Sequence, residues 1–417
     1  MTTLPGTTRR RIAGRLVCTV SGCLGLLAGA IAAPSAASDW QFSASISSGL
    51  QVYPRPPAYA AQDARTTYLS LKFKPSLSYD WNGGDDRFTI APYLWFDVAG
   101  NRRTQFDLRQ ASWLHIGDGW DFVVGIDKVF WGVAESRNLV DIVNQDDTLA
   151  DFGGSEKLGQ PMININFFGD YGTLGLFVLP GFRERAFADT GDRLSGPFPV
   201  IAGDATFEAT DGAHNIDFAL RWEQSLGNWD IGLSQFSGTS REPRLLAEAR
   251  PGGMVLVPRY DLINQSGIDL QYTAGQWLLK LEAISRSGQG PRFYAAVAGF
   301  ETTINGVFGS GADLSLMAEY NYDGRDMTLA PMTIFDDDVF LGARLALSDT
   351  GDTSITAGAL IDRNTGSSAI FLQAGRRLGD NWKIELDGRG FVNIADSDPM
   401  AAIRNDSNFT LRLSRFF

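Results

Sequence analysis

Acidic and basic residues gather around one long connection in the chain, residues 129–160. Opposed carboxylate and guanidinium groups across a polar opening would create a transverse field that orients polar solutes and tunes ion preference. We therefore predict that this connection narrows a passage, with the candidate residues Asp141, Asp146, Asp147, Arg102, Arg103 and Arg109. The alternative, an external loop or a wall strap that touches nothing transported, stays open.

Catalytic chemistry finds less support in the residue types present. The two histidines, His115 and His214, are far apart in the sequence. The chain contains no Gly-x-Ser-x-Gly nucleophile turn and no His-Glu-x-x-His zinc motif. Acidic pairs arise by chance among 48 Asp and Glu residues, so a hydrolase that uses such a pair stays a less favoured alternative. We expect no enzymatic activity and assign no catalytic residue.

Metal and cofactor sites are not expected either. Cys18 and Cys23 are the two cysteines, and both lie within residues 1–37. With two separated histidines, little material remains for a zinc site, and no calcium loop of the Asp-x-Asp-x-Asp-Gly type occurs. The net charge of −12 argues against a nucleic-acid partner.

The first residues are typical of a secretory signal peptide. Four arginines are followed by an apolar run over residues 16–33 and by the small residues Ser35, Ala36 and Ala37. We predict a cleaved signal peptide over residues 1–37 and a second region over residues 38–417. A retained membrane anchor and a lipoprotein signal ending at Cys23 are the less favoured alternatives, because the apolar run is diluted by Gly and continues past Cys23.

From Trp40 onward, apolar and polar residues alternate with a period of two, which is typical of β-strands with one apolar face. Trp40, Phe42, Ala44 and Ile46 begin the first such run. Counting the runs gives about 18 strands, or 16 if weak runs near Ile163 and Gly232 are excluded; many are about 9–12 residues long, enough to cross an apolar layer.

Connections between these runs are alternately short and long, as in outer-membrane barrels. Tryptophans adjoin five of the short turns, the position of an interfacial aromatic girdle: Trp81, Trp120, Trp229, Trp277 and Trp382. A soluble β-sandwich also alternates, but it accommodates fewer strands. We predict an all-β fold, a transmembrane antiparallel β-barrel of about 18 strands (alternative 16), with a long loop that could fold into the lumen.

If the apolar face meets lipid, the opposite face lines the lumen. That assignment predicts a wall of mixed charge, with the lumen-wall candidates Lys72, Lys74, Arg87, Arg221, Glu319 and Arg344. A barrel of this size is too wide for wall side chains to fill, so it leaves an aqueous channel unless loops plug it. For each charge the plain interpretation is a solvated wall residue.

Several stretches resemble a group of uncharacterised porin-like outer-membrane proteins of Gram-negative bacteria. They include Val140-Asp141-Ile142-Val143-Asn144-Gln145-Asp146, Leu179-Pro180-Gly181-Phe182-Arg183-Glu184-Arg185 and Ala318-Glu319-Tyr320-Asn321-Tyr322-Asp323-Gly324-Arg325. The last strand, which ends in Phe417, resembles the C-terminal signature by which such proteins are recognised for assembly. In general porins, the third long loop, here residues 129–160, folds inward to narrow the passage.

These observations together imply an outer-membrane porin-like channel for passive diffusion of small polar solutes, exported through the inner membrane of a Gram-negative bacterium. The alternative is a loop-plugged export or adhesion barrel that binds a partner through its long external loops. Expected partners are outer-membrane lipid, lipopolysaccharide and, through the strand ending in Phe417, the barrel-assembly machinery. Oligomeric state stays open.

Overall fold

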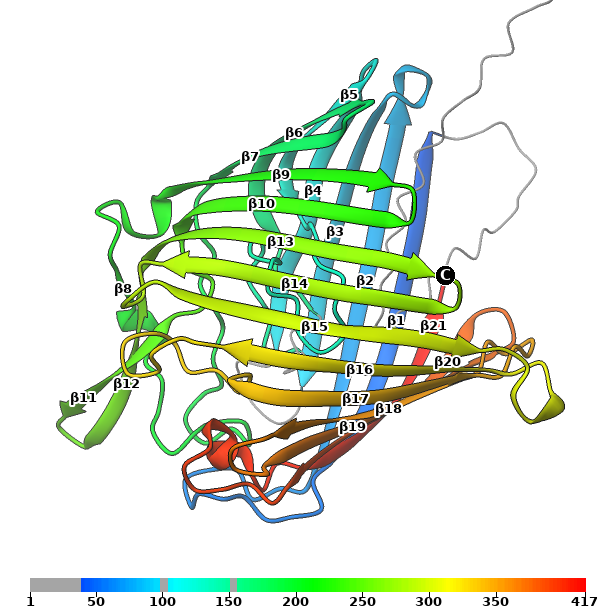
Figure 1. The fold of residues 1–417 in the computed structure, drawn as a ribbon. Coiled ribbons are helices and arrows are strands. Elements are labelled where there is room, and N and C mark those ends of the chain that lie inside the picture. The colour runs from blue at the N-terminus through cyan, green and yellow to red at the C-terminus, as the bar shows by residue number, and fades with distance from the viewer. Residues whose placement is uncertain (1–38, 98–103, 151–155) are drawn as a thin grey trace, which may run out of the picture.

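Alternating residues form 21 strands in the computed structural model, which describes residues 39–97, 104–150 and 156–417. Eighteen of these strands make one antiparallel sheet (Figure 1). They are β1 (Trp40–Val52), β2 (Thr67–Trp81), β3 (Asp86–Asp97), β4 (Gln105–Ile116), β5 (Trp120–Asp127), β6 (Gln160–Gly169), β7 (Gly172–Pro180), β9 (Ile216–Leu226), β10 (Trp229–Thr239), β13 (Leu262–Ala274), β14 (Trp277–Ser287), β15 (Phe293–Ile304), β16 (Asp313–Asp323), β17 (Asp337–Ala346), β18 (Ser354–Asp362), β19 (Ser368–Leu378), β20 (Trp382–Val392) and β21 (Asn408–Phe416).

The sheet closes on itself because β1 pairs with both β2 and β21. Beyond the strand, the backbone of Phe417 exchanges hydrogen bonds with that of Ala44. Closure removes the free strand edges that an open sheet of this size would leave. The prediction of an all-β barrel is confirmed, with eighteen strands instead of the alternative sixteen.

The outer face of the barrel carries the apolar set of each strand. Phe42, Leu69 and Phe106 are 64%, 57% and 72% exposed, and neighbouring strands place similar residues beside them. A soluble protein rarely exposes so much contiguous apolar surface. Because a slip of one residue would exchange this face with the polar one, the apolar pattern specifies the pairing register.

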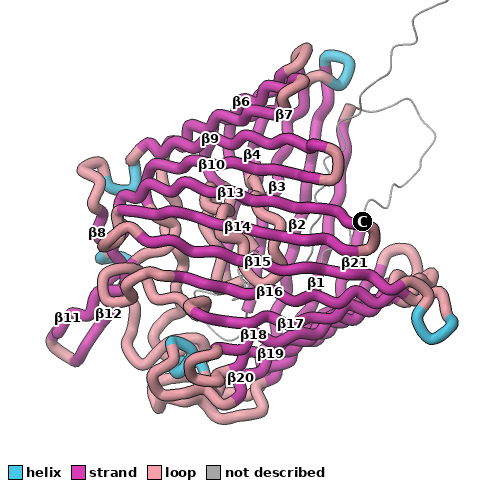
Figure 2. The backbone as a smooth tube through the Cα atoms, in the orientation of Figure 1, coloured by secondary structure: helices cyan, strands magenta, loops and turns pink. Residues whose placement is uncertain are grey.

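The two rims of the barrel differ, as Figure 2 shows by the larger loops at one end. One rim, here called the short-turn rim, carries tight turns such as 227–228 and 275–276. The five tryptophans predicted to form a girdle lie at strand ends on this rim, where β2 ends and β5, β10, β14 and β20 begin. The other, the long-loop rim, carries connections such as 181–215 and 324–336.

The remaining three strands lie outside the barrel sheet. β8 (Thr206–Phe207), β11 (Arg244–Arg250) and β12 (Gly253–Tyr260) form a small sheet, and the β11–β12 hairpin projects from the long-loop rim (Figure 1). Short 3-10 helices occupy connections: η1 (Asn82–Gly84), η2 (Ala202–Asp204), η3 (Gly212–His214), η4 (Val307–Gly309) and η5 (Pro399–Ile403).

Among the described residues, no helix is long and apolar enough to span a membrane. The predicted signal peptide, residues 1–37, lies outside the described residues, as do Arg102 and Arg103.

Candidate functional site

The described parts of the connection between β5 and β6, residues 128–150 and 156–159, lie inside the barrel (Figure 1), and we call them the inserted segment. Its side chains Trp131, Leu139, Val140, Ile142 and Val143 are at most 5% exposed. They form one apolar cluster with lumen-facing wall residues, namely Met162, Phe177, Leu179, Ala219, Phe236, Ile263, Ile284, Ala295 and Val297. Burial of this cluster, worth roughly 1.5–3 kcal/mol per large side chain, holds the segment against the wall.

A second requirement is that the irregular backbone of the segment finds hydrogen-bond acceptors. Glu282 on β14, which is fully buried, supplies them. Its Oε1 accepts from the amides of Val133 and Ala134 at 2.7 and 2.9 Å. Its Oε2 accepts from the amides of Leu139 and Val140 at 2.6 and 3.3 Å. One wall carboxylate thus fastens two turns of the segment.

Glu319 on β16 repeats this arrangement further along. It accepts from the amides of Glu135 and Ser136, both at 2.8 Å. The hydroxyl of Ser136 also donates to Glu319 at 2.6 Å, and the amide nitrogen of Asn321 donates to that hydroxyl at 2.9 Å. Glu319 was predicted as a solvated wall residue, and in the structure it instead binds the segment.

Arg241, in the connection after β10, fastens the other end of the apolar cluster. Its Nε donates to the carbonyl of Val143 at 3.0 Å, and its Nη1 pairs with Asp217 on β9 at 2.5 Å. The guanidinium also lies 5.1 Å from the ring of Phe236. Arg241 is 3% exposed, so its charge depends on Asp217 for compensation.

An ion network links the segment to two long connections. Arg137 of the segment contacts Asp323 at 2.9 Å, Asp323 contacts Arg325 at 2.8 Å, and Arg325 contacts Glu242 at 2.8 Å. Arg286 on β14 contacts Glu242 at 3.0 Å. Burial alone would raise the pKa of Glu242, but Arg325, Arg286 and Arg137 outweigh it and hold that pKa well below its ordinary value.

The structure brings Asp147 and Arg109 into direct contact. Asp147 is fully buried, and Arg109 also bonds the carbonyl of Lys157 and lies 4.4 Å from the ring of Tyr93. A desolvated pair of this kind presents no free charge to water, so it fastens the segment to β4. That the pair acts on a solute stays a prediction.

The other two predicted acids meet a lysine of their own segment. Lys157 contacts Asp141 at 3.1 Å and Asp146 at 2.6 Å. Asp146 also lies 3.6 Å from Arg185 of the following connection. Asp146 is the more accessible of the two acids, with 30% of its side chain exposed against 2% for Asp141.

Glu156, beyond these acids, meets the opposite wall. It contacts Lys74 on β2 at 2.7 Å. Burial would raise the pKa of Glu156, but Lys74, Lys72 and Lys128 outweigh it and lower that pKa from 4.5 to about 2. This contact joins the end of the inserted segment to the β2 wall.

The predicted wall residues all lie on the lumen-facing parity of their strands. Lys72 lies 4.4 Å from the ring of Trp95, and Arg87 pairs with Asp80 near the short-turn rim. Arg221 makes a paired contact with Asp269 at 2.8 and 2.9 Å. The last two of the set, Lys74 and Arg344, contact the inserted segment at Glu156 and Glu135.

The inserted segment covers the lumen face of β13 to β16 closely, whereas it reaches the wall formed by β20, β21, β1 and β2 at Lys74 and leaves other side chains there accessible. Gln265 on β13, Glu282 on β14 and Glu319 on β16, all lumen-facing, are 1%, 0% and 3% exposed. Lumen-facing side chains on the opposite wall are accessible: Lys74 is 36% and Arg412 30% exposed. β1 contributes mainly Ser and Gln to that wall, which leaves room beside it.

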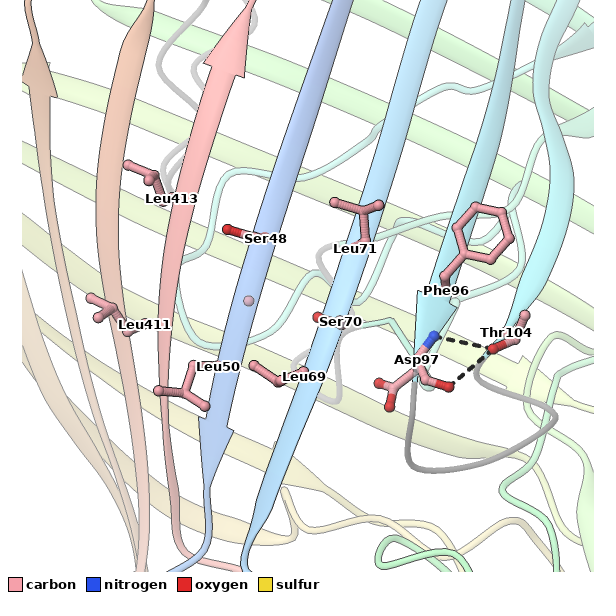
Figure 3. Close-up of a pocket in the computed structure, with 11 residues that line it drawn as sticks. Ser48, Leu50, Leu69, Ser70, Leu71, Phe96, Asp97, Thr104, Leu411 and Leu413 are labelled. Atoms are coloured by element: carbon pink, nitrogen blue, oxygen red, sulfur yellow. Dashed lines mark hydrogen bonds between the residues drawn. The ribbon is translucent and has the colours of Figure 1, made fainter.

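A shallow groove on the barrel lies on the other face of the same strands. Figure 3 shows its lining of Leu50, Leu69, Leu71, Leu411 and Leu413, all on the outward apolar parity of β1, β2 and β21. The groove therefore belongs to the apolar outer surface and not to the lumen route.

Glu282 and Asp217 lie on the lumen-facing parity of their strands, but strand alternation alone does not identify the partners that they have in the structure. Arg137, Arg241 and Glu242 were not singled out, since their roles depend on the path of the segment. The apolar content of residues 129–160 did indicate that such partners exist. An apolar segment must be buried, and its buried backbone amides need hydrogen-bond acceptors.

Comparison with solved structures finds other barrels. OccK3 (OpdO) of Pseudomonas aeruginosa has a TM-score of 0.53 and 12% identity, covering 90% of this chain and 95% of that chain. Wzi of Escherichia coli, described as an outer-membrane protein involved in group 1 capsule assembly and a carbohydrate-binding β-barrel, has a TM-score of 0.50 and 10% identity, covering 89% and 83%. A Rh. blastica porin mutant reaches a TM-score of 0.43 at 11% identity, covering 91% and 100%, too low to carry an argument.

At these identities the likeness concerns the fold alone. The sequence matches no protein-family model and no curated protein. The barrel fold that the resemblance implies is therefore supported by the neighbours with a TM-score of 0.50 or above.

We predict that Glu282→Ala loosens the inserted segment. Four amides would lose their acceptor in a buried site, so the free energy of unfolding should fall by at least about 2 kcal/mol. Urea unfolding of the purified protein in detergent measures it. Glu223→Gln, which alters an exposed lumen carboxylate on β9, is the control. Equal effects of the two substitutions would contradict the assigned role.

A pH effect follows from Glu156. Because its folded pKa of about 2 lies below the ordinary 4.5, its stabilisation is complete above pH 4.5 and is lost as the pH falls toward 2. Protease cleavage within the inserted segment, followed with an acid-active protease, should increase across this window. Glu156→Gln should remove the dependence; an unchanged profile in that variant would assign it to other groups.

Proposed function

We propose that this protein is a porin-like channel of the Gram-negative outer membrane that allows passive diffusion of small polar solutes. The observation that carries the proposal is the one-sided filling of the lumen. The inserted segment buries the lumen face of β13 to β16 and leaves polar side chains on β20, β21, β1 and β2 accessible. A closed wall with a wet polar strip beside an inward loop supports conduction better than it supports a plug.

The alternative is a loop-plugged export or adhesion barrel. Its strongest support is the extent of the long-loop rim and the projecting β11–β12 hairpin, which could bind a partner. Wzi, a barrel of similar fold, is described as carbohydrate-binding. That property belongs to Wzi, and the accessible strip in the present barrel favours the channel.

Two features support the proposed location and partners. The outward apolar face suits contact with lipid and lipopolysaccharide, and the aromatic rim suits a membrane interface. β21, which ends beside Phe417, is the strand expected to be recognised by the assembly machinery, after export guided by the signal peptide.

Conductance in planar bilayers tests the channel. We expect ohmic current from the purified protein, and deletion of residues 135–147 should raise it because the segment no longer occupies the lumen. Removing residues 247–254 from the projecting hairpin is the matched control and should leave conductance unchanged. Absence of current from the parent protein would favour the plugged barrel. Unchanged current in a folded deletion variant would remove the narrowing role.

The accessible strip also predicts a weak preference for anions. On β20, β21, β1 and β2, basic lumen-facing residues outnumber acidic ones: Lys72, Lys74, Lys383, Arg389 and Arg412 against Asp80, Glu385 and Asp387. Arg412→Glu should shift the reversal potential in a salt gradient toward cations. Arg250→Glu, the same charge change on the projecting hairpin, should not. Equal shifts in both variants would show that the strip does not set selectivity.

A further inference from the structure

Three neighbouring strands place polar residues in a row near the long-loop rim. Asn321 on β16 is the direct partner of Asp338 on β17, and Asp338 is the direct partner of Asp362 on β18. Direct partners in antiparallel strands have Cβ atoms about 4.5–5.5 Å apart on the same face. All three side chains lie on the lumen face, and they are 0%, 0% and 6% exposed.

Asp338 is a buried carboxylate without a side-chain donor. Among the described residues no side chain donates to Oδ1 or Oδ2, and the backbone amide of Asp337 is the one group that favours its charge. The charged groups that act on it are Asp336, Asp362 and Asp398, and all three are acidic. Leaving a carboxylate buried and unpaired is costly, so the site calls for a positive group or a proton.

The adjacent residue on the same strand is an aspartate whose carboxylate does have hydrogen-bond donors. Asp337 points to the outer face, where Arg363 and the hydroxyl of Tyr320 each donate to it at 2.8 Å. Asp338, one residue along and on the opposite face, meets no such donors. The lack of partners is therefore specific to the lumen face.

The side chain of Asn321 supplies independent evidence for a cation at this position. The hydroxyl proton of Ser136 is committed to Glu319, so the amide NH₂ of Asn321 must be the group that donates to Ser136. Rotating the amide would break that bond. Its carbonyl Oδ1 is left buried with no donor among the described residues. Three buried acceptor oxygens on two directly paired residues thus lack a side-chain donor among the described residues.

Asp362 is already positioned by the turn that follows it. It accepts from the amides of Asn364 and Thr365 at 2.6 and 3.1 Å, and from the hydroxyl of Thr365 at 2.7 Å. The same hydroxyl lies 3.3 Å from Asp398 of the last long connection. Each carboxylate oxygen has two lone pairs, so Asp362 can still provide a ligand.

We propose that Asn321, Asp338 and Asp362 bind a hard divalent cation, with Ca²⁺ as its best match. Ca²⁺ accepts carboxylate and amide oxygens at about 2.3–2.6 Å in irregular geometry and completes its shell with water, whereas Mg²⁺ demands near-octahedral order. No three His, Cys, Asp or Glu side chains among the described residues form a metal cluster, and the proposed site consists of two carboxylates and the amide oxygen of Asn321. The cation ties β16, β17 and β18 together beside the inserted segment.

Calcium binding by the purified protein in lipopolysaccharide-free detergent tests the proposal. After removal of divalent ions with EDTA, titration with CaCl₂ by equilibrium dialysis should show one saturable site, with Mg²⁺ a weaker competitor. Asp338→Asn should weaken binding at least tenfold. Asp337→Asn, which removes the same charge one residue away on the outer face, is the matched control and should bind as the parent does.

Thermal unfolding gives a second measurement. Ca²⁺ should raise the unfolding temperature of the parent and of Asp337→Asn relative to EDTA, and should not do so for Asp338→Asn. If Asp338→Asn fails to fold, Asp362→Asn takes its place. Absence of a saturable site in the parent, or unchanged affinity in the Asp338 and Asp362 variants, overturns the proposal and leaves Asp338 as a protonated acid that shares its hydrogen with Asn321.

Discussion

An irregular segment inside a barrel must find acceptors for its backbone amides, and this constraint governs the structure. Within the sheet, the backbone carbonyls of the strands accept hydrogen bonds from the amides of neighbouring strands, so these carbonyls are not free to accept from the amides of the inserted segment. Wall side chains must do it. Glu282 and Glu319 meet six amides between them, at positions where the strand pattern requires only something polar. Replacing either glutamate with a short neutral residue would leave the barrel closed but would remove the acceptors that hold the inserted segment in place.

The apolar and the ionic contacts of the segment do different work. The cluster around Trp131 and Val140 supplies burial, which is non-directional and would tolerate several positions of the segment. The contacts of Arg241, Arg137 and Glu282 are directional. If the segment shifts, each contact breaks and leaves a buried charge without its partner, which costs free energy. Burial thus places the segment on one side, and the ionic contacts select one position there.

Much of the barrel was predictable because its pattern is local. Alternation within each strand identified Phe42 as outward and Lys72 and Lys74 as inward, and tryptophans beside short turns marked one rim. The doubtful strands near Ile163 and Gly232 are β6 and β10. Their pattern is weak for a physical reason: Met162 and Phe236 face the lumen but pack on the inserted segment, so both faces carry apolar residues.

The site was less predictable because it depends on contacts between distant residues. Asp141, Asp146 and Asp147 were identified by type and position, and Asp147 does meet Arg109. The other two meet Lys157, a residue of the same segment, which spacing alone did not indicate. Nothing local distinguishes Asp338 from Asp337; only the strand face and the neighbours across two ladders do.

The projecting β11–β12 hairpin has a fastened base and a free tip. Phe182, Phe207 and Tyr260 stack at the base with ring centroids 4.8 to 6.0 Å apart, whereas Leu245 and Met254 further out are 42% and 40% exposed. A residue that touches neither the wall nor the inserted segment can be exchanged without disturbing register or passage. The molecule therefore combines a barrel whose lumen residues constrain one another with a hairpin whose outer residues are free of those constraints.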